Sequence, residues 1–131
     1  MGEISVELAA KIDEISSRAE PREGLAFPRH FTTDLEAGQT PYDALKWEQR
    51  TASIANEKGE VIFEQGDVEM PKGWSQTATN IVVSKYFHGR AGMPERESSL
   101  RQLVHRVVDT IADWGAAGGY FAGDGDAENF R

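Results

Sequence analysis

Three histidines and several acidic side chains are the residues of this 131-residue chain whose types could do chemistry. His105 stands four residues before Asp109 in a predicted helix, so the carboxylate could orient the imidazole for proton transfer. The same spacing is more often a solvated helix face with an i, i+4 pair. His30, His88 and His105 belong to three different predicted elements, and none has a second ligand at metal spacing. We therefore predict no catalytic residue and no metal site.

The acidic C-terminal tail could be taken for a calcium loop. Asp124, Asp126 and Glu128 alternate there with other residues, but the further oxygen ligands of such a loop are missing. The tail's glycines also lack the G-x-G-x-x-G or Walker order that cradles phosphate. We expect Asp124 or Asp126 to cap a last helix and the glycines to form turns.

Basic and aromatic side chains suggest two kinds of surface. Seven basic residues would make a nucleotide-phosphate patch only if the fold gathered them: Arg29, Arg50, Lys85, Arg90, Arg96, Arg101 and Arg106. Aromatic residues at helical spacing more often pack in a core, but Trp74, Tyr86, Phe87 and Trp114 could also face a partner. Our candidate partner interface consists of five residues, namely Trp74, Lys85, Tyr86, Arg101 and His105.

The composition excludes several classes of protein. Without cysteine there is no disulfide, zinc–thiolate site or thiol nucleophile. A formal charge of −8 argues against a nucleic-acid partner, because phosphate contacts need clustered Lys and Arg. No apolar run approaches the roughly 20 residues that cross a bilayer, and no secretory signal is present. We expect a cytoplasmic protein without a membrane or nucleic-acid partner.

One long amphipathic helix is the strongest structural pattern. Its apolar residues recur at helical spacing along one stripe, as burial of one face requires: Leu100, Leu103, Val104, Val107, Val108, Ile111 and Trp114. Ser99 with Gln102 can form a capping box, and Gly115 is a plausible stop.

A hairpin and a second helix are predicted before it. Residues 44–55 and 61–70 alternate like strands, joined by 56–59, and Gly66-Asp67 marks a bulge or an end. Ser75 or Thr77 can cap the helix that follows. Its predicted apolar side comprises Trp74, Ala78, Ile81, Val82, Tyr86 and Phe87.

The fold class is therefore α+β, a β-hairpin packed with two main helices plus an N-terminal helix. Ile4, Leu8, Ile12 and Ile15 form that first helix, and residues 1–25 comprise this helix and a linker. Residues 26–131 form the main domain, which ends in a helix of which only the first turns are present. A split gene, a truncation or an excised domain would explain such an end, as would a frayed terminus.

Four sequence segments occur in a set order: WSQ at 74–76, NIVVSKYF at 80–87, ESSLRQLV at 97–104 and DTIADWG at 109–115. With PYD at 41–43 and WEQR at 47–50, they resemble the N-terminal domain of adenosylcobalamin-dependent (class II) ribonucleotide reductase. The resemblance runs from about Phe27 to the end. These segments are structural and locate no site.

The resemblance implies an enzyme that converts ribonucleotides to deoxyribonucleotides through a cysteine thiyl radical formed by adenosylcobalamin. This chain has no cysteine, so we expect it to be inactive alone and to bind no cofactor by itself. Its expected partner is the catalytic barrel of such an enzyme. The alternatives are a stand-alone interaction or regulatory protein that retains the module, and a small nucleotide-binding domain.

Overall fold

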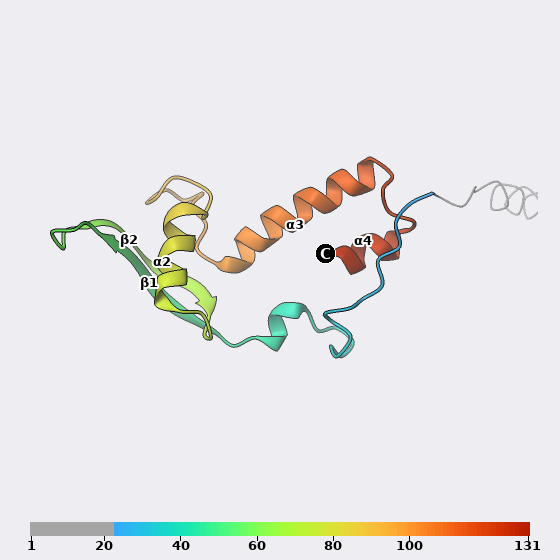
Figure 1. Ribbon diagram of the computed structural model, residues 1–131, viewed down its shortest axis with the longest axis horizontal. Coiled ribbons are helices and arrows are strands. Elements are labelled where there is room, and N and C mark those ends of the chain that lie inside the picture. The colour runs from blue at the N-terminus through green and yellow to red at the C-terminus, as the bar shows by residue number, and fades with distance from the viewer. Residues whose placement is uncertain (1–22) are drawn as a thin grey trace, which may run out of the picture. The chain divides into compact units, whose positions relative to one another are not determined.

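Residues 47–71 fold into the predicted antiparallel hairpin. The computed structural model describes residues 23–131, and in it β1 (Trp47–Ala55) pairs with β2 (Val61–Pro71), as Figure 1 shows in green. Gly59 closes the turn with a φ of 82°, a conformation that glycine adopts without strain. The pairing shifts opposite Gly66-Asp67, where Asp67 has a φ of 52°, so the predicted bulge is confirmed and the strand continues past it.

The predicted start of the first strand is wrong by three residues. Residues 41–44 instead form a 3-10 turn, η1 (Pro41–Ala44). Thr40 and Asp43 form a capping box around it, with a hydrogen bond of 2.7 Å from the Thr40 N–H to Asp43 Oδ2. Because Pro41 also fixes φ at the first position, the local sequence favours the turn over an extended strand.

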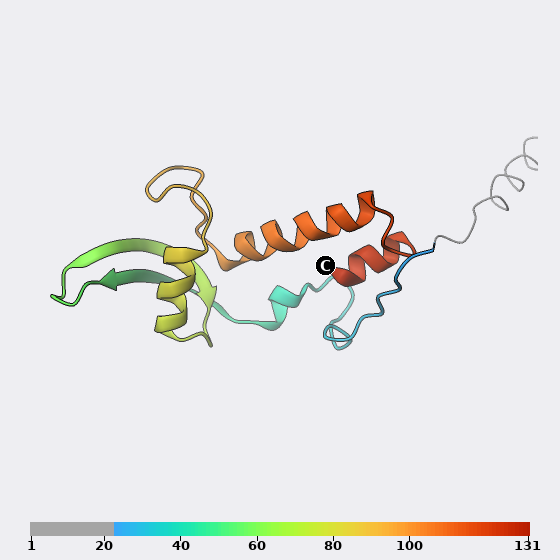
Figure 2. The same ribbon diagram turned by 45° about the horizontal axis from the view of Figure 1, so that its top comes forward.

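Helix α2 (Gln76–Lys85) crosses the hairpin and packs against both of its strands (Figures 1 and 2). Ser75 is its N-cap and accepts a hydrogen bond of 3.1 Å from the Ala78 N–H, so Ser75 rather than Thr77 is the cap. Two polar side chains of α2 bind the outer edge of β1. Gln76 donates to the Thr51 carbonyl at 2.9 Å, and Asn80 accepts from the Ser53 N–H at 3.1 Å. These contacts satisfy edge groups that would otherwise face water.

The face of α2 that meets the hairpin differs from the prediction. Thr79 and Val83 are fully buried, whereas Ile81 is 41% exposed. Thr79 can face the core because its hydroxyl donates to the Ser75 carbonyl at 3.1 Å and accepts from Arg50 at 2.9 Å. The core comprises Ala52, Val68, Met70, Val83, Phe87 and Leu100. Full burial of an aliphatic side chain there stabilises the fold by about 2 kcal/mol.

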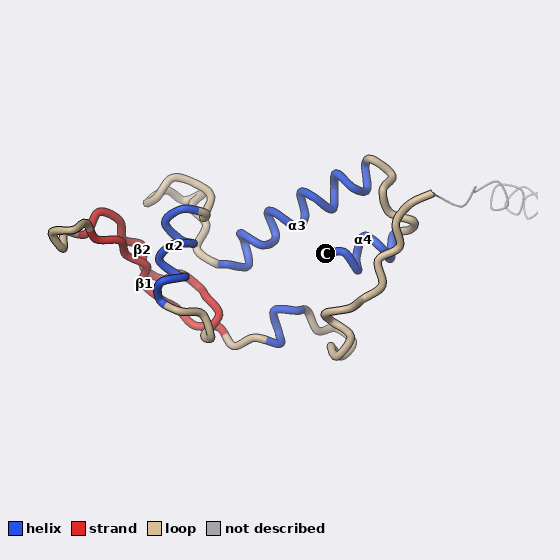
Figure 3. The backbone as a smooth tube through the Cα atoms, viewed as in Figure 1, coloured by secondary structure: helices blue, strands red, loops and turns tan. Residues whose placement is uncertain are grey.

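Helix α3 (Leu100–Ala117) begins at the predicted capping box. The Ser99 hydroxyl accepts from the Arg101 N–H at 3.2 Å, and Gln102 Oε1 accepts from the Ser99 N–H at 3.2 Å. Figure 3 shows its helical path continuing to the loop that precedes α4 (Asp124–Phe130). The described residues therefore have the predicted α+β fold, while the predicted N-terminal helix falls outside residues 23–131.

Gly115 does not stop α3, contrary to the prediction. The helix runs two residues further, to Ala117, and is followed by Gly119, which has a φ of 72°. The Tyr120 N–H donates to the Gly115 carbonyl at 2.9 Å and the Gly119 N–H to the Ala116 carbonyl at 3.3 Å, which is a Schellman motif. Only glycine takes this left-handed position at low cost, so Gly119 sets the end of the helix.

The described chain divides into two units, residues 30–111 and residues 23–29 with 112–131. In the second unit, Leu25 donates to the Tyr120 carbonyl at 2.7 Å and accepts from the Ala122 N–H at 3.0 Å. Phe27 packs edge to face with Phe121 and Phe130, and the three ring centroids are 5.5–5.8 Å apart. Phe121 is 9% exposed and forms part of this cluster, whereas Tyr120 is 66% exposed.

The predicted acidic caps of α4 are wrong. Gly123 occupies the N-cap position without a side-chain hydrogen bond, and Asp124 and Asp126 lie in the first turn. Asp126 instead accepts a hydrogen bond of 2.8 Å from the Phe27 N–H. The carboxylate therefore binds a segment distant in sequence, which a local capping rule does not consider. No helix within residues 23–131 is both long and apolar enough to cross a membrane.

Candidate interaction surface

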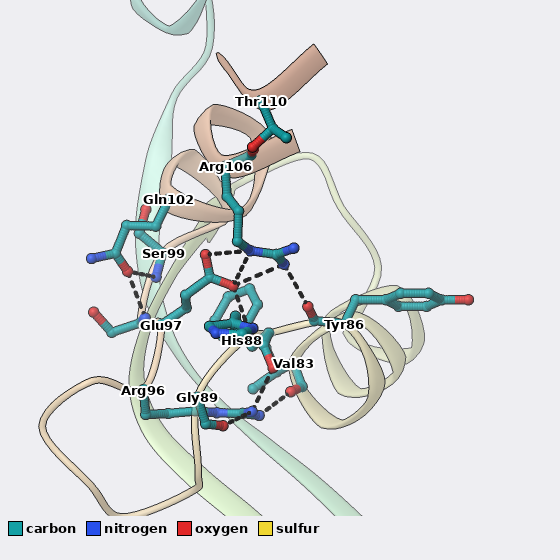
Figure 4. A network of polar contacts seen from close by, with 12 residues as sticks. Val83, Tyr86, His88, Gly89, Arg96, Glu97, Ser99, Gln102, Arg106 and Thr110 are labelled. Carbon is teal, nitrogen blue, oxygen red and sulfur yellow. Dashed lines mark hydrogen bonds and ion pairs between the residues drawn. The ribbon is translucent and has the colours of Figure 1, made fainter. Parts of the chain in front are cut away.

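A buried carboxylate organises the loop between α2 and α3. Glu97 is 8% exposed and accepts hydrogen bonds from Arg106 Nη2 at 3.1 Å and from the His88 N–H (Figure 4). The Glu97 N–H in turn donates to the His88 carbonyl at 2.9 Å. Arg106 also donates to the Tyr86 carbonyl at 3.0 Å. The network thus joins the first turns of α3 to the end of α2.

The electrostatics of Glu97 favour its charged form. Burial raises the pKa of Glu97, but the hydrogen bonds from Arg106 and from the His88 backbone outweigh that effect. The pKa therefore lies below the ordinary value of 4.5. A carboxylate that stays ionised and is fully hydrogen-bonded is a structural anchor, and it has no proton to donate at neutral pH.

Arg96 fixes the carbonyl end of α2 in the same region. Its guanidinium donates to the carbonyls of Val83, Phe87 and Gly89, the last at 2.9 Å. Figure 4 shows the contacts with Val83 and Gly89. Its Nε donates to Gln65 Oε1 at 3.0 Å. A cation at this end also complements the negative end of the helix dipole. Arg96 therefore caps the C-terminus of α2 through its side chain.

Other arginines of the hypothetical phosphate patch are engaged in similar contacts. Arg50 donates to the carbonyls of Lys72 and Trp74 at 3.0 and 2.7 Å and pairs with Glu48 at 2.7 Å. Arg29 donates to Asn129 at 3.2 Å in the other unit. Binding a phosphate would require these guanidinium groups to give up their present hydrogen bonds, which costs free energy.

Arg101 and His105 lie in an aromatic cluster with Tyr42 and Trp47. The Arg101 guanidinium lies 4.3 Å from the centroid of Trp47 and 5.4 Å from that of Tyr42, at cation–π distance. It also pairs with Glu69 at 2.9 Å. The Tyr42 and His105 rings are 5.3 Å apart. Arg101 and His105 were predicted from the sequence, but Tyr42 of η1 and Trp47 of β1 were not, because only the fold brings them to α3.

Neither titratable ring of this cluster has the features of a catalytic group. Burial raises the pKa of Tyr42, the charge of Asp109 adds to that rise, and the charge of Arg101 opposes it. A raised pKa makes the phenol a poorer proton donor at neutral pH. The His105 and Asp109 side chains are 59% and 43% exposed and 3.3 Å apart, which is the solvated i, i+4 pair favoured by the sequence.

The five candidate interface residues fall into two groups. Trp74, Lys85 and Tyr86 lie on or beside α2, where Trp74 is 39% exposed and Tyr86 is 61% exposed. Arg101 and His105 lie on α3 and belong to the aromatic cluster described above. Of the aromatic side chains considered for a partner, Phe87 is instead buried in the core.

The apolar stripe of α3 is buried only in its first half. Leu100 is buried, and Leu103 and Val104 pack against the core. Further along, Val107, Ile111 and Trp114 are 42%, 44% and 68% exposed, so the predicted burial of the whole stripe is wrong for this part. The hairpin and α2 supply apolar partners for the first turns of α3, whereas Val107, Ile111 and Trp114 present apolar surface to solvent. This exposed surface is the feature most typical of a docking site.

We assign no cofactor or metal ligand to the described residues. In residues 23–131, every buried side-chain nitrogen and oxygen has a hydrogen-bond partner. The same residues contain no group of three His, Asp or Glu side chains placed to hold a metal ion.

Comparison with known proteins gives a consistent family. Residues 48–131 match the family model described as class II vitamin B12-dependent ribonucleotide reductase. The chain is 51% identical over 110 residues to the vitamin B12-dependent ribonucleotide reductase of Rhodopirellula baltica, covering 83% of this chain and 10% of that protein. It is 47% identical over 109 residues to the enzyme of the same name from Streptomyces coelicolor, covering 82% and 11%. The chain thus spans about a tenth of the length of these curated relatives, within their N-terminal part.

Proposed function

The chain belongs to the family of class II vitamin B12-dependent ribonucleotide reductases, and we propose that it is the N-terminal structural module of such an enzyme. The complete enzyme would reduce ribonucleotides to deoxyribonucleotides with adenosylcobalamin. This chain would carry no catalytic residue. The extent of the match supports the proposal most directly, since four fifths of the chain aligns with a tenth of the relatives.

The absence of thiols and the use of charged groups support a non-catalytic role. The chain has no cysteine, and reductase chemistry as implied by the resemblance needs a thiyl radical. The buried carboxylate of Glu97 and the guanidinium of Arg96 both bind backbone groups. These side chains serve the fold, so catalysis and the cobalamin site would lie in the remainder of the enzyme.

The proposed partner is the catalytic barrel of the same reductase in the cytoplasm. The interface residues proposed from sequence are Trp74, Lys85, Tyr86, Arg101 and His105. We also propose that residues 26–131 form the module and that residues 1–25 are a helix and linker. The hydrogen bonds of Leu25 to Tyr120 and Ala122 support a boundary close to Leu25.

A stand-alone interaction protein is the second candidate. The exposed Val107, Ile111 and Trp114 would suit it equally well, since such a patch is typical of partner binding. A nucleotide-binding domain is a weaker third candidate. Nucleoside triphosphate at 100 times its dissociation constant should raise stability by about 2.7 kcal/mol, so an unchanged melting temperature would exclude it.

The test uses three full-length polypeptides. These are the Rhodopirellula baltica reductase, the same protein without the segment that matches this chain, and a chimera in which this chain replaces that segment. We expect deletion to lower cobalamin-dependent reduction of ribonucleoside di- and triphosphates by about tenfold or more, and the chimera to restore it. Full activity of the deletion variant would refute the structural role, and a folded but inactive chimera would favour the stand-alone alternative.

A further inference from the structure

The second half of α3 carries an apolar strip, which we define as Val107, Thr110, Ile111 and Trp114. These positions recur at spacings of three and four residues, so they share one face of the helix. Val107 is 42% exposed, Ile111 is 44% exposed and Trp114 is 68% exposed. Single exposed apolar residues are ordinary on protein surfaces, but several on one helix face form a patch.

Thr110 does not interrupt this apolar character. Its hydroxyl donates to the Arg106 carbonyl at 2.6 Å within the same helix, so the polar atom already has a partner. The strip contains no ionisable side chain. It can therefore be covered by an apolar surface without leaving a charge or an unpaired polar group buried.

The strip continues the apolar stripe of α3 whose first residues, Leu100, Leu103 and Val104, pack against the core. Ala112 is 1% exposed, and Gly115 lies against the Phe121 ring. Near the start of the helix, Arg101 meets the aromatic rings of Trp47 and Tyr42. Arg101, Ala112 and Gly115 lie on an adjacent side of the helix, and their contacts leave the strip exposed.

We propose that the strip docks on the remainder of the reductase polypeptide, an inference that rests on the proposed function. We infer this binding partner from the length of the relatives and from the net charge of this chain. The relatives are about ten times as long as the matching segment, so most of the polypeptide surface available to the strip lies outside this chain. A second copy is disfavoured, because two chains with a formal charge of −8 each repel one another.

The first measurement compares amide hydrogen exchange in the 131-residue chain and in the full-length chimera with the Rhodopirellula baltica reductase. We expect peptides from the second half of α3 to exchange about tenfold more slowly in the chimera. Peptides from the hairpin serve as the internal control and should exchange equally in both. Equal exchange of α3 in both proteins would overturn the proposal, and so would a dimeric 131-residue chain whose α3 is already protected.

A matched pair of variants in the chimera then tests the strip itself. Ile111→Asp should remove the added protection, whereas Ile111→Leu should keep it. Ala116→Asp adds the same charge to the same helix on an exposed position about 140° away, and it should have no effect on protection. Similar behaviour of Ile111→Asp and Ala116→Asp would overturn the proposal.

The activity of the chimera separates the two proposals. An active chimera without protection of α3 would overturn the docking strip and leave the structural module intact. Protection of α3 in an inactive chimera would support docking and count against the functional role. The exchange experiment on the unmutated chimera gives its answer even if Ile111→Asp does not fold.

Discussion

Arg96 and Arg106 hold the loop after α2 by donating hydrogen bonds to its carbonyls, whereas the loop after α3 is held by Phe121 packed against Gly115. Both loops carry irregular backbone whose polar groups need partners. In residues 30–111 the partners are charged side chains, Arg96 from the loop itself and Arg106 from α3. In the other unit they are backbone groups, namely those of Leu25 and the Schellman turn at Gly119.

Because the two loops are held by different contacts, we expect the stabilities of the two units to respond to different kinds of substitution. We call the contacts that hold a loop in place its tethers. The stability of a tether made by guanidinium and carboxylate groups depends on their ionisation and on the number of hydrogen bonds that one side chain makes. Tethers made by ring packing depend on volume, because a close-packed contact tolerates neither a void nor an extra methyl group. A substitution can therefore change either the side-chain hydrogen bonds of one loop or the ring packing of the other.

The largest expected effect comes from removing the Phe121 ring. Phe121→Ala deletes a side chain that is 9% exposed and contacts two other rings, so we expect the unit of residues 112–131 to lose about 4 kcal/mol. Amide exchange in α4 measures this loss. Phe31→Ala is the control because that ring is 96% exposed, and equal effects of the two substitutions would contradict the packing argument.

Removal of Arg96 should have the next largest effect. Arg96→Ala leaves three backbone carbonyls and the Gln65 side chain without their donor, so we expect a loss of about 3 kcal/mol in the unit of residues 30–111. Urea unfolding followed by circular dichroism measures it. Arg90→Ala, at an exposed position in the same loop, should change stability by about 0.5 kcal/mol or less. If both variants had the same unfolding midpoint, the hydrogen bonds of Arg96 would not stabilise this unit.

Local patterns predicted the elements well, because they depend on neighbours in sequence. Ser75 caps α2 and Ser99 with Gln102 caps α3, as expected from residues two to four positions apart. Gly119 was missed because several glycines follow α3, and only the backbone conformation selects the one at positive φ. Asp43 was missed as a capping residue because η1 is a single turn without apolar periodicity.

The tethers and the exposed strip could not be predicted from the sequence. Arg96 reaches carbonyls seven to thirteen residues away, and a carbonyl has no sequence signature. Periodicity identified one apolar face over all of α3, but it does not say which part of that face this chain covers. Burial of Leu100 and exposure of Ile111 follow from the reach of the hairpin and α2.

Glu97 should make stability depend on pH. Glu97→Gln weakens the hydrogen bonds to Arg106 and the His88 N–H, so we expect a loss of about 2 kcal/mol at pH 7. The folded-state pKa of Glu97 lies below its ordinary value of 4.5, so its stabilisation is complete well above that pH. It is lost as the pH falls through the lowered pKa.

Urea unfolding at neutral and acidic pH tests whether the stabilisation by Glu97 is lost as the pH falls. The difference in stability between the unmutated chain and Glu97→Gln should shrink as the pH falls below 4.5. Glu95→Gln, two residues away and exposed, should not change the unfolding midpoint at neutral pH. A difference that stays constant with pH would show that the carboxylate charge does not stabilise the loop.

The smallest effect is expected at Gly115, where two opposing contributions nearly cancel. Alanine in a helix interior is favoured over glycine by about 1 kcal/mol. A Cβ at Gly115 would lie 2.7 Å from Phe121 Cε2, so the ring must shift, which costs about 2 kcal/mol. We therefore expect Gly115→Ala to destabilise the unit by about 1 kcal/mol, measured by amide exchange in α4. Gly125→Ala in α4 meets no atom within 4 Å and should stabilise it instead. If both substitutions stabilise the unit, the Phe121 ring moves freely and the close packing that distinguishes this region is absent.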